Sequence, residues 1–100
     1  MRKPIARYAI TFGMPGYMPD WHGGALEVTT RRELAAVIRD TLRLLDLPAS
    51  LFREVRINRL WSFIKRHGSS SAHFNLYRGG HVLSFHGLTE DEYTQQQDEI

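Results

Sequence analysis

The chain has 100 residues, 42% hydrophobic and 11% aromatic, which suffices for the core of one domain but not of two. It has no cysteine, which excludes disulfide bonds, thiolate nucleophiles and thiolate metal sites, and no apolar segment approaches membrane-spanning length. Arg7 and Gly13 interrupt the N-terminal region before an apolar signal segment can form. We therefore expect a single domain over residues 1–100, cytoplasmic and without a membrane partner.

The formal net charge of +2 hides an uneven distribution of charge. Residues 1–89 carry thirteen basic and six acidic side chains, whereas residues 90–100 carry five acids and no base. Two arrangements fit this split: a surface that seeks acidic partners beside a solubilising tail, or a tail that folds back and partly neutralises that surface.

Alternating apolar and polar residues predict two strands in the first third of the chain, over 7–12 and 25–29. We expect the two strands to pair as antiparallel neighbours. The side chains expected on the core side are Tyr8, Ile10 and Phe12 from the first strand, and Leu26 and Val28 from the second.

A capping box at Thr30-Arg31-Arg32-Glu33 predicts the start of a helix of about four turns, which Pro48 would end. One stripe of this helix is apolar and should face the core: Leu34, Val37, Ile38, Thr41, Leu42 and Leu45. Charged residues lie largely off that stripe: Arg32, Arg39, Asp40 and Arg43.

Between Ser50 and His67 the pattern favours a short helix, an extended link and a second helix. Asn58 is positioned to cap the second helix and Gly68 to end it. The run Ser69-Ser70-Ser71 has the composition of a short flexible joint.

The span 72–87, AHFNLYRGGHVLSFHG, predicts a hairpin that turns at Gly79-Gly80, because glycines tolerate the positive φ values of a two-residue turn. Pairing about that turn places on the core face Phe74 opposite Phe85 and Leu76 opposite Leu83. The other face receives His73 with His86, Asn75 with Ser84, and Tyr77 with Val82. A slip of one residue would turn the phenylalanines toward water, so the pattern specifies this register.

A second capping box, Thr89-Glu90-Asp91-Glu92, predicts a C-terminal helix that frays toward Ile100, with a hydrophobic staple between Leu88 and Tyr93. Together these elements predict an α+β fold: a single two-layer domain of about four antiparallel strands with helices packed on one face. The opposite face of the sheet is expected to stay open to solvent or to a partner, as antiparallel sheets permit.

The histidines do not make a persuasive metal site. His73 and His86 could converge on one ion, but two ligands are too few, and His81 points to the other face of the hairpin. Ordinary surface histidines are the preferred interpretation, and we predict no metal and no cofactor. The serines between His67 and His73 have the composition of a linker, and no nucleophile elbow is present, so we expect no enzymatic activity.

The loop 13–24, GMPGYMPDWHGG, carries four large apolar residues: Met14, Tyr17, Met18 and Trp21. These side chains could close the open end of a small core, with prolines stiffening the path. Alternatively they form a recognition loop, because Tyr, Trp and Met are common anchors at protein interfaces. Together with the polar hairpin face, the candidate partner-binding residues are Tyr17, Met18, Trp21, His73, Asn75, Tyr77, Ser84 and His86.

A basic group lies in the region of the two short helices and is opposed nearby only by Glu54: Arg53, Arg56, Arg59, Lys65 and Arg66. Arginine suits both a phosphate backbone and an acidic protein surface. Bases stacked on Tyr77 and on His73 or His86 would strengthen nucleic-acid binding. The aromatic motif of the common RNA-binding module is absent, and no helix-turn-helix spacing is persuasive.

The stretches GMPGYMPD (Gly13–Asp20), TTRREL (Thr29–Leu34) and RLWSFIKRHGSSSAHF (Arg59–Phe74) belong to a chain that resembles, in overall format, the small cysteine-free accessory proteins of bacteriophages and mobile elements. Anti-CRISPR proteins are the group among these that it resembles. The resemblance transfers no residue role, and the basic body differs from the acidic, DNA-mimicking members. It implies a stoichiometric inhibitor that occupies a surface of a CRISPR effector complex.

Our leading hypothesis is a non-enzymatic protein-binding module, encoded by a phage, that inhibits a host protein or ribonucleoprotein complex such as a CRISPR effector. The alternative is a small basic nucleic-acid-binding or regulatory protein. The sequence leaves the oligomeric state open.

Overall fold

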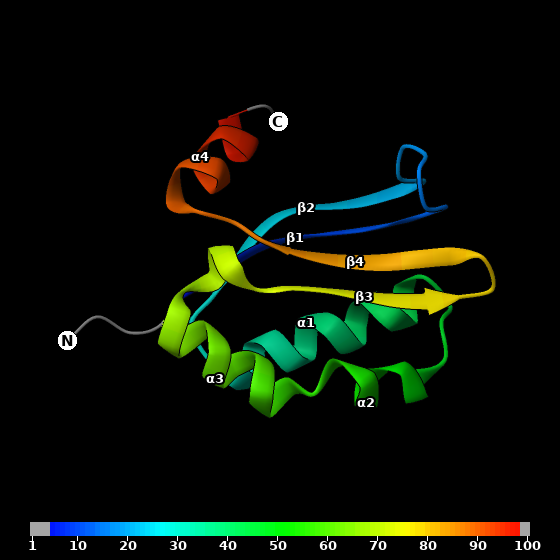
Figure 1. Ribbon diagram of the computed structural model, residues 1–100, viewed down its shortest axis with the longest axis horizontal. Helices are drawn as coiled ribbons and strands as arrows, with labels where there is room; N and C mark the ends of the chain where they lie inside the picture. Colours follow the sequence, from blue (N-terminus) through cyan, green and yellow to red (C-terminus); the bar gives the residue numbers. More distant parts are fainter. Residues whose placement is uncertain (1–4, 99–100) are drawn as a thin grey trace.

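Four antiparallel strands form one sheet in the order β2-β1-β4-β3 in the computed structural model, which describes residues 5–98 (Figure 1). The strands are β1 (Ala6–Gly13), β2 (Trp21–Val28), β3 (His73–Arg78) and β4 (His81–Gly87). The helices are α1 (Arg31–Leu44), α2 (Phe52–Val55), α3 (Ile57–His67) and α4 (Glu90–Asp98). The expected α+β fold with four antiparallel strands is confirmed, and none of the described helices is both long and apolar enough to cross a membrane.

The main core lies between the sheet and helices α1 to α3. At its centre, Phe85 of β4 is fully buried and stacks between two rings, with centroid distances of 5.0 Å to Tyr8 and 4.9 Å to Phe74. The predicted stripe of α1 supplies Leu34, Ile38 and Leu42 to this core. Burying each such side chain contributes about 1.5–3 kcal/mol, so the stripe holds α1 against the sheet.

The first two strands pair as predicted, but β2 is longer than expected. Trp21 and His22 pair with Phe12 and Thr11, so the last four residues of the predicted loop, 21–24, belong to the strand. A bulge interrupts the strand pairing there. Gly24 adopts a φ of +76° there. Leu26 pairs with Tyr8 and so lies on the helical side of the sheet, as expected, but it is 41% exposed there, because β2 is an edge strand with a neighbour on one side only.

The capping box of α1 is confirmed, because the Glu33 N–H donates to Thr30 Oγ1 at 3.1 Å. The predicted end is wrong, since the helix stops at Leu44, ahead of Pro48. Asp46 adopts a left-handed φ of 57°, which lets the Leu47 N–H donate to the Leu42 carbonyl at 2.8 Å. This is a Schellman ending, here built on an aspartate in place of the usual glycine.

Between α2 and α3 the expected extended link is a single residue. Arg56 adopts a left-handed conformation, φ 52° and ψ 62°, and α3 begins at the next residue, Ile57. Asn58 therefore lies inside the first turn and does not cap the helix, contrary to the prediction. Gly68 ends α3 as predicted, and its N–H donates to the Ile64 carbonyl at 2.8 Å.

The serine run is a 3₁₀ turn, Ser69–Ser71, and the prediction of a flexible joint is wrong. Ser69 is buried, and its hydroxyl donates to the Leu88 carbonyl at 3.1 Å. The Gly87 N–H donates to the Ala72 carbonyl at 2.8 Å, and the two backbones approach so closely that a Cβ on Gly87 would collide with the Ser69 carbonyl. This junction clamps the end of β4 against the start of β3.

The hairpin of β3 and β4 has the predicted register at every pair, from His73 opposite His86 to Arg78 opposite His81. Gly79 and Gly80 both adopt positive φ values, 56° and 83°. The phenylalanines and leucines of the hairpin consequently face the helices, together with His81, whereas His73, Asn75, Tyr77, Ser84 and His86 face the opposite side of the sheet.

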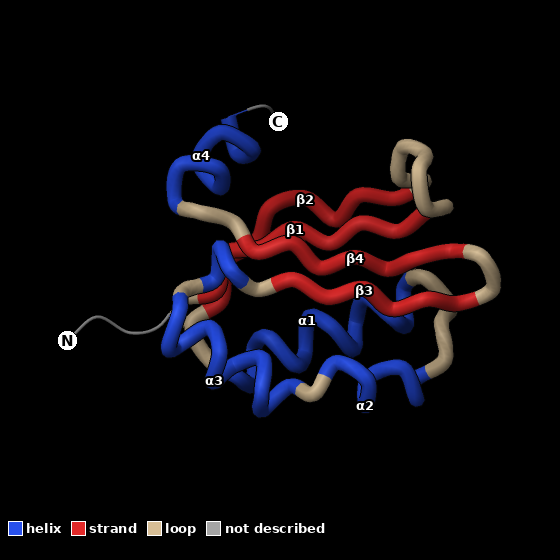
Figure 2. Tube along the Cα trace, in the orientation of Figure 1, coloured by secondary structure: helices blue, strands red, loops and turns tan. Residues whose placement is uncertain are grey.

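The second capping box is also confirmed, with the Glu92 N–H donating to Thr89 Oγ1 at 3.1 Å. Tyr93 packs with Leu88 against Ala9 and Ala25, on the sheet face opposite the main core. The expectation of an entirely open second face is thus wrong at its β1–β2 end, where α4 lies apart from the other helices (Figure 2). The expected fraying at Ile100 falls outside the described residues.

The position of α4 decides between the two arrangements of the acidic tail over its described part. The helix contacts β1 and β2, and the acids of its first turn lie across the sheet from α2 and α3. The acids of the first turn, Glu90, Asp91 and Glu92, therefore form no ion pair with the basic group on those helices.

We predict that Gly87→Ala lowers the free energy of unfolding by about 3 kcal/mol, because the added methyl group must push Ser69 away and open the junction. Urea denaturation followed by circular dichroism measures the change. Ser69→Ala, which removes only a hydrogen bond, should cost about 1 kcal/mol. A Gly87→Ala variant as stable as the wild type would contradict the close contact.

The Tyr8 hydroxyl is buried without a hydrogen-bond partner in the described part of the protein. Burial, and to a lesser degree the charge of Glu33, raises the pKa of Tyr8 above its ordinary value. We predict that Tyr8→Phe, which keeps the ring stack, raises the free energy of unfolding by about 1 kcal/mol at neutral pH.

Above a pH of about 10, Tyr8 ionises in the unfolded chain but not in the folded chain, so the free energy of unfolding falls as the pH rises. The Tyr8→Phe variant should lose less of its free energy of unfolding over the same pH range. Urea denaturation at neutral and alkaline pH tests both effects. A less stable variant at neutral pH would show that the hydroxyl makes a favourable contact.

Candidate functional site

Five predicted side chains share the sheet face opposite the main core, on the part of the hairpin that lies beyond the α4 cluster: His73, Asn75, Tyr77, Ser84 and His86. In the described part of the protein no hydrogen bond engages any of these side chains. Their donors and acceptors are therefore free to pair with another molecule.

Two polar rows cross the sheet at this face. One row contains His22, Thr11, Ser84 and Asn75, and the other ends in His86 and His73. The rings of His73 and His86 stand edge to face with centroids 6.4 Å apart. Over residues 5–98, no three His, Asp or Glu side chains lie close enough together to hold a metal ion.

The histidines influence one another's ionisation. Burial lowers the pKa of His86 below its ordinary value of 6.5, and the positive charges of His73 and His22 lower it further. The His86 imidazole therefore favours its neutral form, which both donates and accepts hydrogen bonds.

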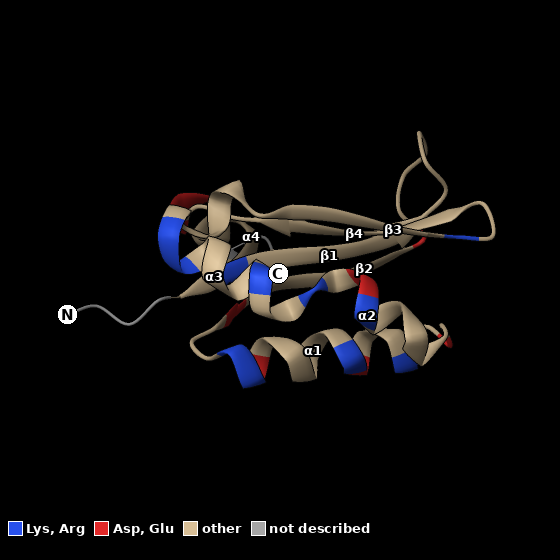
Figure 3. Cartoon of the chain, turned by 60° about the horizontal axis from the view of Figure 1, so that its bottom comes forward, with Lys and Arg blue, Asp and Glu red and all other residues tan. Residues whose placement is uncertain are grey.

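The loop between β1 and β2 borders this face and projects away from α1 and α2 (Figure 3). Tyr17 and Met18 are 74% and 88% exposed, and Met14 beside them is also exposed. A groove of about 170 Å³ is lined both by this loop, including Tyr17, and by Val82 and Ser84 of β4. Loop and hairpin thus form one continuous surface.

We call this the sheet surface and define it by the following residues: Met14, Tyr17, Met18, His73, Asn75, Tyr77, Ser84 and His86. Trp21 does not belong to it. Because Trp21 pairs with Phe12, it lies on the helical side of the sheet and packs against the main core. Closing the end of the core is therefore the correct interpretation for Trp21, whereas the loop residues 14–18 remain exposed.

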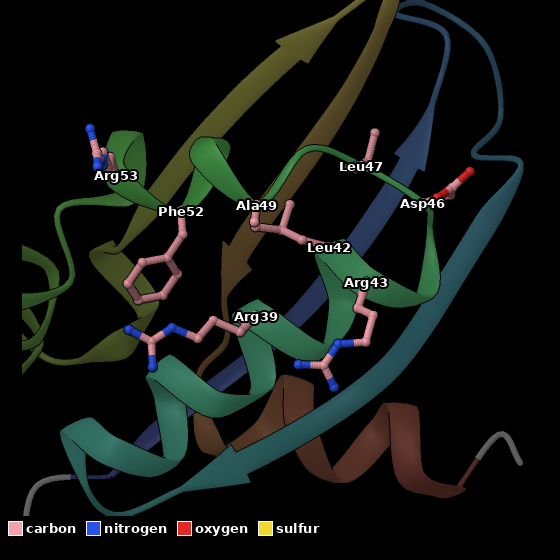
Figure 4. Close-up of a pocket in the computed structure, with 8 residues that line it drawn as sticks. All are labelled: Arg39, Leu42, Arg43, Asp46, Leu47, Ala49, Phe52 and Arg53. Carbon is pink, nitrogen blue, oxygen red and sulfur yellow. The ribbon is translucent and has the colours of Figure 1, made fainter.

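A second surface lies on the helices, where three grooves adjoin. The first, of about 450 Å³, runs between α1 and the segment 46–53 (Figure 4). The second, of about 440 Å³, shares Phe52 and Arg53 with the first. The third, of about 450 Å³, shares Asn58 and Arg59 with the second and continues along α3.

We call these three the helical groove. Its basic side chains are all arginines: Arg39, Arg43, Arg53, Arg56, Arg59 and Arg66. Its one acidic residue is Asp46, whose carboxylate points away from the Arg39 and Arg43 guanidinium groups in Figure 4. Figure 3 shows basic residues on α1 and along the segment from α2 to α3.

The structure thus brings together four of the five predicted basic residues and leaves Lys65 outside the groove. It adds Arg39 and Arg43, which the sequence placed off the apolar stripe of α1 but which we did not assign to the site. Their i, i+4 spacing was the available signal, since it puts both on one helix face. The sequence does not show that α1 packs beside α2, which is what brings these two arginines to the groove.

No arrangement for nucleophilic catalysis emerges from the serine run. The Ser69 hydroxyl is buried and donates to a backbone carbonyl, which makes it a structural donor.

We predict that, in an NMR titration, His86 has a lower midpoint than a histidine in an unstructured peptide, and that His73→Gln raises this midpoint by removing a repulsive charge. His81→Gln, on the other face, is the control and should leave it unchanged. Because the pKa of His86 is lower in the folded state, its contribution to stability is complete above about pH 6.5 and is lost as the pH falls from there through the lower pKa of the folded state. An unshifted His86 midpoint in the His73→Gln variant would show that the charge of His73 does not act on His86, which would contradict the prediction.

The protein presents two exposed surfaces of different chemistry, one polar and hydrogen-bonding, the other rich in arginine. Comparison with models of known protein families, with curated proteins and with solved structures finds no match to this chain. What each surface can bind follows from its own side chains.

Proposed function

We propose that the chain is a non-enzymatic protein-binding module that docks on its partner through the sheet surface. The observation that carries this proposal is the continuity of exposed loop anchors with a row of side chains free of internal hydrogen bonds. Protein interfaces combine a core of aromatic and methionine side chains with polar groups that pair across the boundary.

The rigidity of the surface supports the same proposal. The hairpin fixes the polar side chains in register, and the loop folds tightly at Gly13, where an added Cβ would lie 2.9 Å from the Asp20 nitrogen. His81 stacks on Phe12 with centroids 5.4 Å apart, and its Nε2 lies 4.0 Å from Asp20 Oδ2, which ties the hairpin to the loop. A preorganised surface loses less conformational entropy when a partner binds.

The similarity in format to anti-CRISPR proteins extends the proposal to a phage-encoded inhibitor that acts in the host cytoplasm. In this form the chain binds a host defence complex in a fixed ratio and blocks one of its working surfaces. The partner is then a protein, or the protein part of a ribonucleoprotein.

Capture from host lysate with the immobilised protein, followed by titration of the purified partner in a calorimeter, tests the binding. We predict saturable binding in a fixed ratio, weakened about tenfold or more by Tyr17→Ala combined with Met18→Ala, because truncation of a central anchor costs at least about 1–2 kcal/mol. Leu44→Ala is the matched control, since Leu44 is an apolar residue of α1 that is 69% exposed and lies outside the sheet surface.

Equal weakening by the control, or none by the loop variant, would remove the sheet surface from the proposal. For the inhibitor form, activity of the partner complex should fall in proportion to added protein and vanish at saturation. Full activity at saturation would reject inhibition while leaving the binding result intact.

A further inference from the structure

The helical groove lies on the opposite side of the protein from the sheet surface, so its chemistry calls for a separate ligand. Its six arginines are exposed, and of these six only Arg43 forms an ion pair with a described residue, a 3.5 Å contact with Asp40 that is itself solvent-exposed. Exposed pairs of this kind contribute little, so the positive charge of the groove stays available.

The shape of the groove favours an extended polyanion. Neighbouring grooves share residues, so the arginines form a track from α1 across α2 to α3 with no enclosed pocket for a compact ion. Guanidinium groups bind phosphate oxygens with two parallel hydrogen bonds and also stack on flat rings, which the ammonium group of lysine cannot do.

Aromatic rings lie along the same track. The Arg39 guanidinium sits over the Phe52 ring, 4.3 Å from its centroid. Phe63, at 40% exposure, lines the α3 groove with its ring 4.7 Å from that of His67. Contact with the backbone of a duplex needs no such rings, whereas unpaired bases stack on them.

We propose that the helical groove binds single-stranded nucleic acid, with the arginines on the phosphates and Phe63 with His67 as a platform for an unpaired base. This site goes beyond the proposed function and does not depend on it. The two faces can be occupied together, so a partner held on the sheet surface leaves the groove free to hold a strand.

Fluorescence anisotropy with labelled oligonucleotides tests the proposal directly. The probes are single-stranded RNA and DNA of one mixed sequence, the corresponding DNA duplex, and a polyglutamate peptide of equal charge. Both single strands should bind more tightly than the duplex and the peptide, with an affinity that falls steeply with salt, at a logarithmic slope of about −4 if six phosphates are neutralised. The tighter of the two strands identifies the natural polynucleotide.

Matched variants localise the site. Arg59→Glu combined with Arg66→Glu should weaken single-strand binding at least tenfold, whereas Lys65→Glu, a charge reversal on α3 outside the groove, should change it less than half as much on a logarithmic scale. Phe63→Leu keeps an apolar side chain but removes the ring, and should weaken single-strand binding several-fold while sparing the duplex. Thermal melts confirm that each variant is folded.

Three results would overturn the proposal. If the duplex or polyglutamate bound more tightly than the single strands, the groove would be a general cationic patch without preference for unpaired bases. Equal losses of single-strand affinity in the Lys65→Glu and Arg59→Glu/Arg66→Glu variants would show that binding depends on overall positive charge and not on the arginines of the groove. Absence of single-strand binding at low salt would exclude the site altogether.

Discussion

Both exposed surfaces depend on the register of β4 between β1 and β3. This strand forms ladders with both neighbours, and its side chains alternate between Phe85 in the main core and Ser84 and His86 on the outer face. A slip of one residue would expose the phenylalanine and bury a hydroxyl and an imidazole without partners, a penalty of several kcal/mol. The turn at Gly79 fixes one end of the strand and the contact of Gly87 with Ser69 fixes the other. Burial of Phe85 in the core therefore determines which side chains of β4 face outward.

The features that could be predicted from the sequence are those whose cause lies within a few residues. The glycine pair and the alternating hairpin residues specify the register, because turn geometry and burial favour the same pairing. Both capping boxes are likewise local, since the side chain of Thr30 or Thr89 reaches an amide only three residues further on. The alternation within the hairpin also predicted which of its side chains share the sheet surface.

The features that escaped prediction have causes elsewhere in the chain. Arg56 and Asp46 adopt left-handed conformations that side chains normally avoid, and these are maintained by the packing of the helices they join. Small residues at positions 9 and 25 admit α4, yet each reads locally as an ordinary strand alanine. The helical groove was predicted only in part, without Arg39 and Arg43, for the same reason: Arg39 lies beside Phe52 only after α1 and α2 have packed together.

The fold also separates charge that the whole sequence nearly balances. The arginines line the helical side, while the acids that open α4 lie across the sheet, so a net charge of +2 conceals opposite local fields. Such fields are screened over about 8 Å at physiological salt, so each acts mainly on its own side of the domain. Under our two proposals, a polyanion is drawn to the helical groove before contact, whereas the sheet surface selects a protein partner by shape and hydrogen bonding after contact. Because the two proposed modes of selection differ, the two proposals together describe one small domain that engages a protein and a strand without competition between them.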